Sequence, residues 1–245
     1  LRGPQGTLFG RNTIGGAISM TSSDPANEFG GRVRVIAGED DRYEAFATLN
    51  TPFSEILRAV FSGLYRVRDG YVKRDDGVDL GDDNVLGGRM KVVLDATEDL
   101  TFTLSVDGVR EREESAPEVS IDVLEDAPFI NFYNSNAFGN GAHSNCAGGG
   151  ALDNPSCAND QFAGAPFRSS ETGPSVNDVD SWGVSLVADW QLNDDIAVKS
   201  ITAYRELDAT FARASDGTPF LIFQTTDDYE QDQFSQELRF IGNSF

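Results

Sequence analysis

The chain has 245 residues, of which 39% are hydrophobic, enough for one large β domain or two smaller ones. No continuous apolar run approaches the length of about 18 residues that a transmembrane helix needs, so such a helix is excluded. Membrane strands are not excluded, because their apolar residues alternate with polar ones. The net charge of -21 argues against binding nucleic-acid phosphates and is typical of a solvated surface, or of loops that attract cations or cationic ligands.

The first 22 residues, LRGPQGTLFGRNTIGGAISMTS, are rich in glycine and lead into an apolar stretch. Glycine permits close backbone approach and positive φ angles, and Pro4 presets a turn. The stretch lacks the Lys-Ser/Thr pair that follows the glycines of a phosphate-binding loop. No strand precedes it in this chain, so a dinucleotide-binding fingerprint has no structural context either.

From Gly31 onward, residues alternate between apolar and polar with a period of two, which predicts β-strands. In LTFTLSVDGVR, for example, four apolar residues fall on one face: Leu100, Phe102, Leu104 and Val106. The charges of the predicted strands gather on the opposite face. We expect eight strands, at about 31–38, 42–51, 56–68, 85–95, 99–110, 181–192, 195–207 and 231–241.

Three features favour an outer-membrane barrel over a soluble sandwich. The polar faces are rich in charge, as expected for a wide, wet lumen. Aromatic residues lie near strand ends: Trp182 and Trp190 are separated by about 26 Å of strand, near the height of an apolar band between aromatic girdles. The connections alternate, short at NTPFSE, DATED and QLNDD but long at 69–84, 111–180 and 208–230, although the short GEDDR turn breaks this rule. We expect the girdle to include Tyr65, Trp182, Trp190 and Tyr204.

The long segment 111–180 has little periodicity, and we interpret it as an external loop with some folded structure of its own. It contains the two cysteines of the chain, Cys146 and Cys157. Their spacing is too wide for a redox C-x-x-C pair. A disulfide between them fits an oxidising compartment and would contribute about 3 kcal/mol. Two free thiols, or a metal site with the lone His143, are the alternatives.

The stretch RDDGVDLGDDN, at 74–84, has five aspartates and one arginine. A solvated external loop is one interpretation. Binding of divalent cations, shared with lipopolysaccharide phosphates, is the other. The spacing does not match an EF-hand loop, so the sequence identifies no specific metal site.

The opening stretch closely resembles the end of the plug domain of TonB-dependent outer-membrane receptors, where RGPQGxLYGRNxxGGAIN passes into the first barrel strand. Phe9 replaces the usual Tyr, Ser19 the usual Asn, and Met20 the usual Ile or Val. LYRVRDGYV (64–72) and FSQELRF (234–240) also resemble barrel strands of the family. The matching plug residues are Arg2, Gly3, Pro4, Gln5, Gly6, Gly10, Arg11, Asn12, Gly15, Gly16, Ala17 and Ile18.

The resemblance implies an all-β fold: a partial transmembrane antiparallel β-barrel, with about eight strands of a larger plugged barrel. Residues 1–26 would end the plug, and residues 27–245 would begin the barrel, with the long external loop at 111–180. The chain would then be an internal fragment of a protein in the outer membrane of a Gram-negative bacterium.

The implied function is active uptake of a ferric siderophore, haem, cobalamin or oligosaccharide, energised by TonB through a segment outside this chain. Outer-membrane lipid and lipopolysaccharide would be the other partners. A passive porin-like barrel and a soluble secreted lectin or adhesin are the alternatives. No nucleophile–base set is visible, so we expect no enzyme, and we expect no cofactor.

In this family, plug arginines form ion pairs with barrel glutamates. Arg2 matches the motif position, Arg11 lies nearby in sequence, and Glu237 is the best barrel partner that this chain offers. A latch between plug and barrel through these residues is therefore one hypothesis. In the other, Glu237 pairs with lumen arginines on its own or a neighbouring strand and Arg2 caps plug carbonyls.

Overall fold

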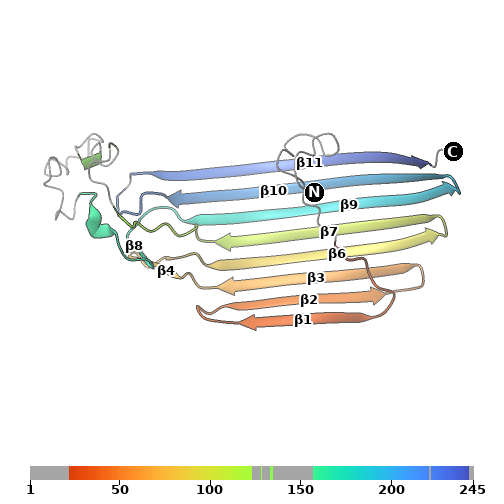
Figure 1. The fold of residues 1–245 in the computed structure, drawn as a ribbon, viewed down its shortest axis with the longest axis horizontal. Coiled ribbons are helices and arrows are strands. Elements are labelled where there is room, and N and C mark those ends of the chain that lie inside the picture. Colours follow the sequence, from red (N-terminus) through yellow and green to blue (C-terminus); the bar gives the residue numbers. More distant parts are fainter. Residues whose placement is uncertain (1–21, 123–127, 129–132, 135–156, 221, 243–245) are drawn as a thin grey trace.

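The computed structural model describes residues 22–122, 128, 133–134, 157–220 and 222–242. Their main feature is a single eight-stranded sheet, seen in Figure 1 as a broad row of strands that lie side by side and alternate in direction. The sheet order is β1-β2-β3-β6-β7-β9-β10-β11. Each long strand pairs antiparallel with the next long strand along the chain, so the sheet is a meander.

All eight predicted strands are present. Their bounds are β1 Gly30–Ala37, β2 Tyr43–Pro52, β3 Leu57–Arg68, β6 Asp83–Thr97, β7 Leu100–Glu113, β9 Val176–Asn193, β10 Ile196–Ala214 and β11 Gln224–Gly242. Short turns join β2 to β3, β6 to β7 and β9 to β10 at one end of the sheet. The longer connections, together with the β1–β2 turn at 38–42, lie at the other end, called here the loop end.

The last strands extend further toward the loop end than the sequence predicts. β9 begins at Val176 rather than at 181, β10 continues to Ala214 rather than 207, and β11 begins at Gln224 rather than 231. The predicted loops at 111–180 and 208–230 therefore shorten to 114–175 and 215–223. The predicted pattern of an apolar outer face stops before the strands do, because the outer face carries Asp180, Asp208 and Glu230 there, whereas backbone pairing continues.

The two faces of the sheet have different chemistry. Leu104 and Leu186 are direct cross-strand partners on the face called here the outer face. One row of partners on this face runs across six strands and is almost wholly apolar: Phe61, Met90, Val106, Val184, Tyr204 and Phe234. Many large apolar side chains of this face are exposed, such as Phe240 at 71%. Ser105, Lys91 and Ser185 lie on the opposite, inner face.

Near the loop end, the outer face changes from apolar to charged. Asp180, Asp208 and Glu230 form one cross-strand row. Arg112 pairs with Asp180, and Arg110 contacts the same carboxylate at 3.2 Å. A strand of about 9–11 residues is enough to cross a bilayer, whereas β9, β10 and β11 have 18, 19 and 19 residues. Their charged ends therefore project beyond the apolar band.

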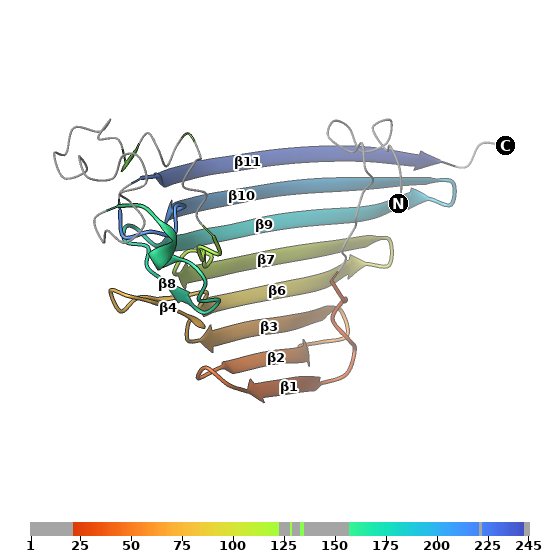
Figure 2. The same cartoon turned by 60° about the vertical axis from the view of Figure 1, so that its left-hand side comes forward.

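Three short strands that the sequence did not predict form a second, three-stranded sheet at the loop end. They are β4 (Val72–Arg74), β5 (Asp79–Leu80) and β8 (Arg168–Ser169), in the order β5-β4-β8. β4 and β8 pair in parallel although they come from different loops. Figure 2 shows β4 and β8 beyond the ends of β3 and β6. This confirms the expectation of folded structure within the long loop.

Among the residues that the structure describes, no helix has the length and apolar character needed to cross a membrane.

Candidate functional site

Three loops join into one folded unit at the loop end, called here the loop cluster. They are residues 69–82, the described segments 114–122 and 157–175 of the loop between β7 and β9, and residues 215–220 with 222–223. The β4–β5 hairpin of the cluster turns at Gly77, whose φ of +93° favours glycine. Val72 and Leu80 on this hairpin are buried, with 2% and 0% exposure. Burial of these two apolar side chains stabilises the short strands at the end of the main sheet.

Residues 168–172 tie the three loops together. Backbone bonds join them to the β4 loop, from Lys73 N–H to the Phe167 carbonyl and from Asp75 N–H to the Ser169 carbonyl, both 3.0 Å long. The Ser169 hydroxyl donates to the Glu118 carbonyl at 3.0 Å. Thr172 donates to the Pro219 carbonyl at 3.0 Å, which reaches the third loop.

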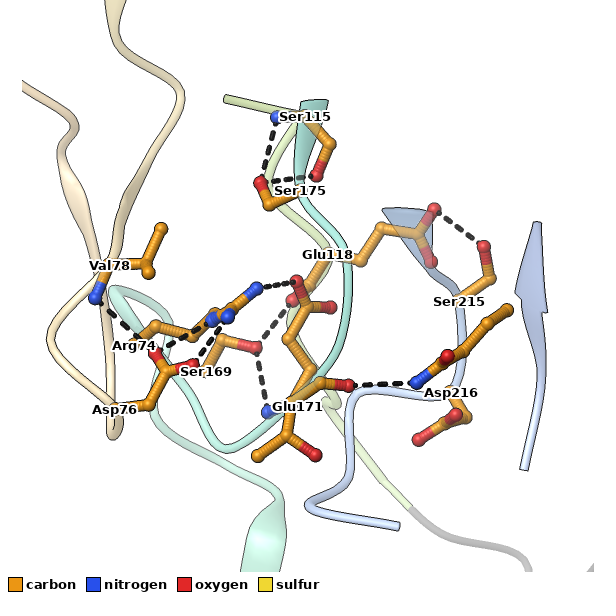
Figure 3. A network of polar contacts seen from close by, with 12 residues as sticks. Arg74, Asp76, Val78, Ser115, Glu118, Ser169, Glu171, Ser175, Ser215 and Asp216 are labelled. Carbon is orange, nitrogen blue, oxygen red and sulfur yellow. Dashed lines mark hydrogen bonds and ion pairs between the residues drawn. The ribbon is translucent and has the colours of Figure 1, made fainter. Parts of the chain in front are cut away.

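At the centre of this cluster lies Glu171, with 0% exposure (Figure 3). Neither of its carboxylate oxygens has a hydrogen-bond partner. The nearest cation is Arg74, whose Nη1 is 3.8 Å from Oε1 of Glu171. Burial raises the pKa of Glu171 to about 7, because the attraction of Arg74 offsets the loss of water only in part, and Glu118, Asp216 and Asp76 raise it further.

Arg74 itself binds mainly to Asp76. Its side chain is 4% exposed, and its Nε donates to Oδ1 of Asp76 at 2.8 Å, while Nη2 donates to Oδ2. This fork is the bidentate geometry in which Arg holds carboxylates best. It lowers the pKa of Asp76, chiefly through the hydrogen bonds from Arg74. The fork occupies Nε and Nη2 of Arg74, so only its Nη1 lies near Glu171, and this nitrogen has no hydrogen-bond partner.

The five aspartates of the stretch at 74–84 all have protein partners. Asp75 accepts from Arg168 and Ser170, Asp79 from Lys73, and Asp82 from the Glu114 N–H. The other two, Asp76 and Asp83, pair with arginines. The stretch is thus a hydrogen-bonded and ion-paired part of the fold rather than a simple solvated loop. Within the described residues, no group of three or more His, Cys, Asp or Glu side chains is placed to hold a metal ion.

A pocket of about 290 Å³ lies on the inner face just below the loop cluster. Asn177, Phe211 and Asp227 form one cross-strand row in its wall. Arg213 stands beside them with its side chain 56% exposed and its Nη1 3.7 Å from Glu118. The other lining residues are Ser115, Ala116, Val176, Ala212 and Thr225. The wall thus offers an aromatic ring, a cation and a carboxylate within one hollow.

Residues that enter the sheet from the N-terminal side lie on the inner face. The Lys91 ammonium donates to the Ser22 carbonyl at 3.3 Å and pairs with Asp24. The Ala26 N–H donates to Oδ1 of Asn50 at 3.2 Å. The polar face is therefore the one along which the chain arrives, as expected if a plug precedes the first strand inside a barrel.

We expect Lys91→Met to release residues 22–26 from the sheet. Lys91 is buried, with its side chain 10% exposed, but Asp24 is 78% exposed, so the loss should be modest, about 1 kcal/mol of local stability. Faster hydrogen exchange at the Ala26 amide would show it. Lys199→Met, which breaks an inner-face pair with Asp189 on another strand, should leave that amide unchanged. Equal exchange in the wild type and Lys91→Met would contradict the tether.

Several sequence-predicted site residues lie outside the described residues. These are the plug motif at 2–18, with Arg2 and Arg11, and also Cys146 and His143. Cys157 is buried and disulfide-bonded, but its pairing with Cys146 stays a prediction. Glu237 pairs with Arg239, two residues along on its own strand, so the latch to Arg2 or Arg11 also stays a prediction.

The four predicted girdle residues are on the outer face. Tyr65, Trp182 and Trp190 are 46%, 45% and 50% exposed. The rings of Trp182 and Tyr204 pack with centroids 5.5 Å apart. Trp190 lies near the short-turn end of β9, whereas Trp182 lies nearer the charged rows. Their role at the membrane interfaces stays a prediction.

The sequence did not identify Arg74 with Glu171, the wall around Arg213, or the Lys91–Asp24 pair as sites. Partners far apart in the chain meet only through the sheet register and the loop contacts. A lone charged residue in a Gly- and Asn-rich segment, such as Glu171 after RSS, carries no pattern that would mark it as buried.

An antiparallel meander with an apolar outer face, a polar inner face, short turns at one end and folded loops at the other is the wall of an outer-membrane β-barrel. No protein-family model matches the chain. A segment is 35% identical over 71 residues to the ferrioxamine B receptor of Salmonella typhimurium, covering 28% of this chain and 10% of that receptor. Another match, 38% over 55 residues, is to the metal-pseudopaline receptor CntO of Pseudomonas aeruginosa, covering 22% and 8%.

Solved structures with the same fold include the ferric yersiniabactin uptake receptor FyuA of Yersinia pestis, with a TM-score of 0.63 and 18% identity. The ferric-catecholate import receptor Fiu of E. coli K12 has a TM-score of 0.67 and 12% identity. Each match covers 100% of this chain and 33% of the receptor, so the chain spans about a third of their length. The chain thus has the fold of part of these receptors, and in fold and in the matching segments it is similar to TonB-dependent receptors, which lie in the outer membrane of Gram-negative bacteria.

Proposed function

We propose that this chain forms the plug–barrel junction and part of the barrel wall of an importer for a small metal chelate. In this proposal, residues 1–26 end the plug and residues 27–245 begin the barrel. The observation that carries it is the pocket on the inner face, placed directly below a folded loop cluster. A ligand that arrives from outside would meet the loops first and then a wall with a ring, a cation and a carboxylate.

The names of the relatives support a metal chelate over cobalamin, haem or an oligosaccharide. The curated relatives are receptors for ferrioxamine B and for metal-pseudopaline, and the solved structures are receptors for ferric yersiniabactin and ferric catecholates. We infer a siderophore-like ligand for this chain as well. The role of the protein in this proposal is binding and import, for which it needs no catalytic residues.

Energy would come from TonB, through a segment outside this chain. A passive porin-like barrel would work without it. Uptake of radioactive iron, supplied on a panel of siderophores to cells with and without TonB, distinguishes the two. Uptake that needs both this receptor and TonB supports the proposal. Uptake that persists without TonB favours the passive barrel, and no uptake of any chelate contradicts the proposed substrate class.

We expect Arg213→Ala to weaken ligand binding about tenfold, since a charged hydrogen bond to a ligand contributes on the order of 1–2 kcal/mol. The Arg213 side chain is 56% exposed, so the variant should fold normally. Direct binding to the purified complete receptor is the measurement. Arg239→Ala is the matched control, because it also removes an inner-face arginine with a similar exposure of 53%, but far from the pocket. Unchanged affinity in Arg213→Ala would place the ligand elsewhere.

A further inference from the structure

The strongest unexplained feature of the molecule is the buried carboxyl of Glu171 at the junction of three loops. A buried polar group without a hydrogen bond costs free energy, and a buried charge costs more unless it is well paired. Glu171 has 0% exposure and no hydrogen bond to either oxygen, and its contact with Arg74 is 3.8 Å long. This geometry suits a neutral carboxylic acid far better than a carboxylate.

The charges around Glu171 are mostly of its own sign. Arg74 is the one cation that contacts it among the described residues, and Asp76 already holds that arginine in a bidentate fork. The charged groups that face Glu171 and Arg74 come from all three loops and are Asp76, Glu114, Glu118 and Asp216. Glu118 in turn contacts Arg213 at 3.7 Å and the Ser215 hydroxyl at 3.3 Å. A negative charge on Glu171 would add to this repulsion.

The position of Glu171 gives its charge a wide effect. The neighbouring residues Ser169 and Thr172 make hydrogen bonds to Glu118, in the 114–122 segment of the same loop, and to Pro219, in the loop between β10 and β11. The Glu171 N–H donates to the Ser169 hydroxyl at 3.3 Å (Figure 3). Gln224 donates to the Thr172 carbonyl at 3.1 Å. Displacement of the Glu171 side chain toward water would therefore strain the contacts of every loop in the cluster.

We propose that Glu171 is a proton-controlled clamp: the loop cluster is closed when this side chain is neutral and loosens when it ionises. The clamp acts in a cluster that overlies the wall pocket, so its effect on ligand capture rests on the proposed import function. The clamp itself does not, because closing and loosening of the loops can be measured without any ligand.

The direction of the pH effect on the loop cluster follows from the linkage between protonation of Glu171 and closure of the cluster. The pKa of Glu171 is about 7 in the closed cluster, whereas an ordinary glutamate in water has a pKa of about 4.5. The stabilisation of the closed cluster by neutral Glu171 is fully present below the ordinary pKa of the side chain. It is lost as the pH rises through the higher pKa of the closed cluster. Opening of the cluster should increase about tenfold between about pH 6 and about pH 8, with most of the change below about pH 7.

The test is hydrogen exchange at the Asp75 amide, which bonds to the Ser169 carbonyl across β4 and β8. It is measured on the complete receptor without ligand and corrected for the intrinsic pH dependence of exchange. In the wild type, exchange should accelerate about tenfold between about pH 6 and about pH 8. In Glu171→Gln it should be slow at both pH values. In Arg74→Gln the acceleration should shift to higher pH, because the carboxylate loses its cation.

Asp122→Asn is the matched control, since Asp122 is an exposed acid of the same loop, and it should keep the wild-type profile. Glu171→Met is a second neutral variant, in case the glutamine side chain of Glu171→Gln does not pack. Methionine is apolar and close in volume to glutamate, and the Asp75 amide of this variant should also exchange slowly at both pH values. A flat wild-type profile, or an undiminished rise in Glu171→Gln, would overturn the clamp. Fast exchange at both pH values in both Glu171 variants would overturn it as well, since neutrality would then not hold the loops. A normal clamp without chelate uptake would contradict only the import function.

Discussion

Leu104→Arg and Leu186→Arg should each destabilise the complete receptor by about 2–4 kcal/mol. These two leucines are direct partners in the middle of the apolar outer face, and Leu186 is 43% exposed there. An arginine at the bilayer midplane must either leave water or distort the lipid, and both cost free energy. Reversible unfolding into lipid vesicles, titrated with denaturant, measures the loss.

The matched control for these variants is Ser185→Arg. Ser185 is adjacent to Leu186 in sequence but lies on the inner face, where charge is already common, so its replacement should cost much less. Ser105→Arg is a less clean control, because Ser105 is only 8% exposed and pairs across the strand with Lys91. Equal losses at Leu186 and Ser185 would mean that the two faces are assigned the wrong way round.

Arg74→Met should cost the loop cluster about 3 kcal/mol of local stability, the lower end of the range for breaking a buried ion pair. The arginine is 4% exposed, and its loss removes the two-pronged partner of Asp76 and the cation beside Glu171. The lower end applies because Asp76 is 36% exposed and Glu171 can take a proton instead. Hydrogen exchange of the β4 and β8 amides, at a pH near neutrality, measures the change.

Arg168→Met provides the comparison. Arg168 lies on β8, opposite β4, and pairs with Asp75 at 2.5 Å, but its side chain is 68% exposed. A solvent-exposed pair contributes about 0–1 kcal/mol, so this variant should barely change local exchange. If Arg74→Met and Arg168→Met had the same small effect, burial of Arg74 would not be what holds the cluster.

The long strands could be predicted because one physical requirement runs through them. A lipid-facing side and a wet side force a period of two, so the patterns around Leu104 and Leu186 identify both the strands and their faces. The prediction ended too early where that requirement ends. At Asp180, Asp208 and Glu230 the outer face carries charges in place of apolar side chains, so the pattern of an apolar outer face ends, although the backbone ladder continues.

The loop cluster could not be predicted for a different reason. β4 and β8 are 3 and 2 residues long and pair in parallel across separate loops, so neither has a local pattern. The aspartates at 74–84 look like solvated charges in the sequence, and only the fold shows that each one has a partner. The acidity of Glu171 depends on burial by three loops, which no single stretch of sequence encodes.

The charged ends of β9, β10 and β11 have a consequence for how a ligand would be recognised. Asn177, Phe211 and Asp227 of the wall pocket lie one row from Asp178, Thr210 and Asp228 of the outer face, beyond the apolar band. The pocket therefore lies in the aqueous layer outside the bilayer, where the dielectric constant is high and mobile ions penetrate. At physiological ionic strength the screening length there is about 8 Å. Attraction between this wall and a charged chelate should thus be short-ranged and should weaken as the surrounding medium becomes saltier.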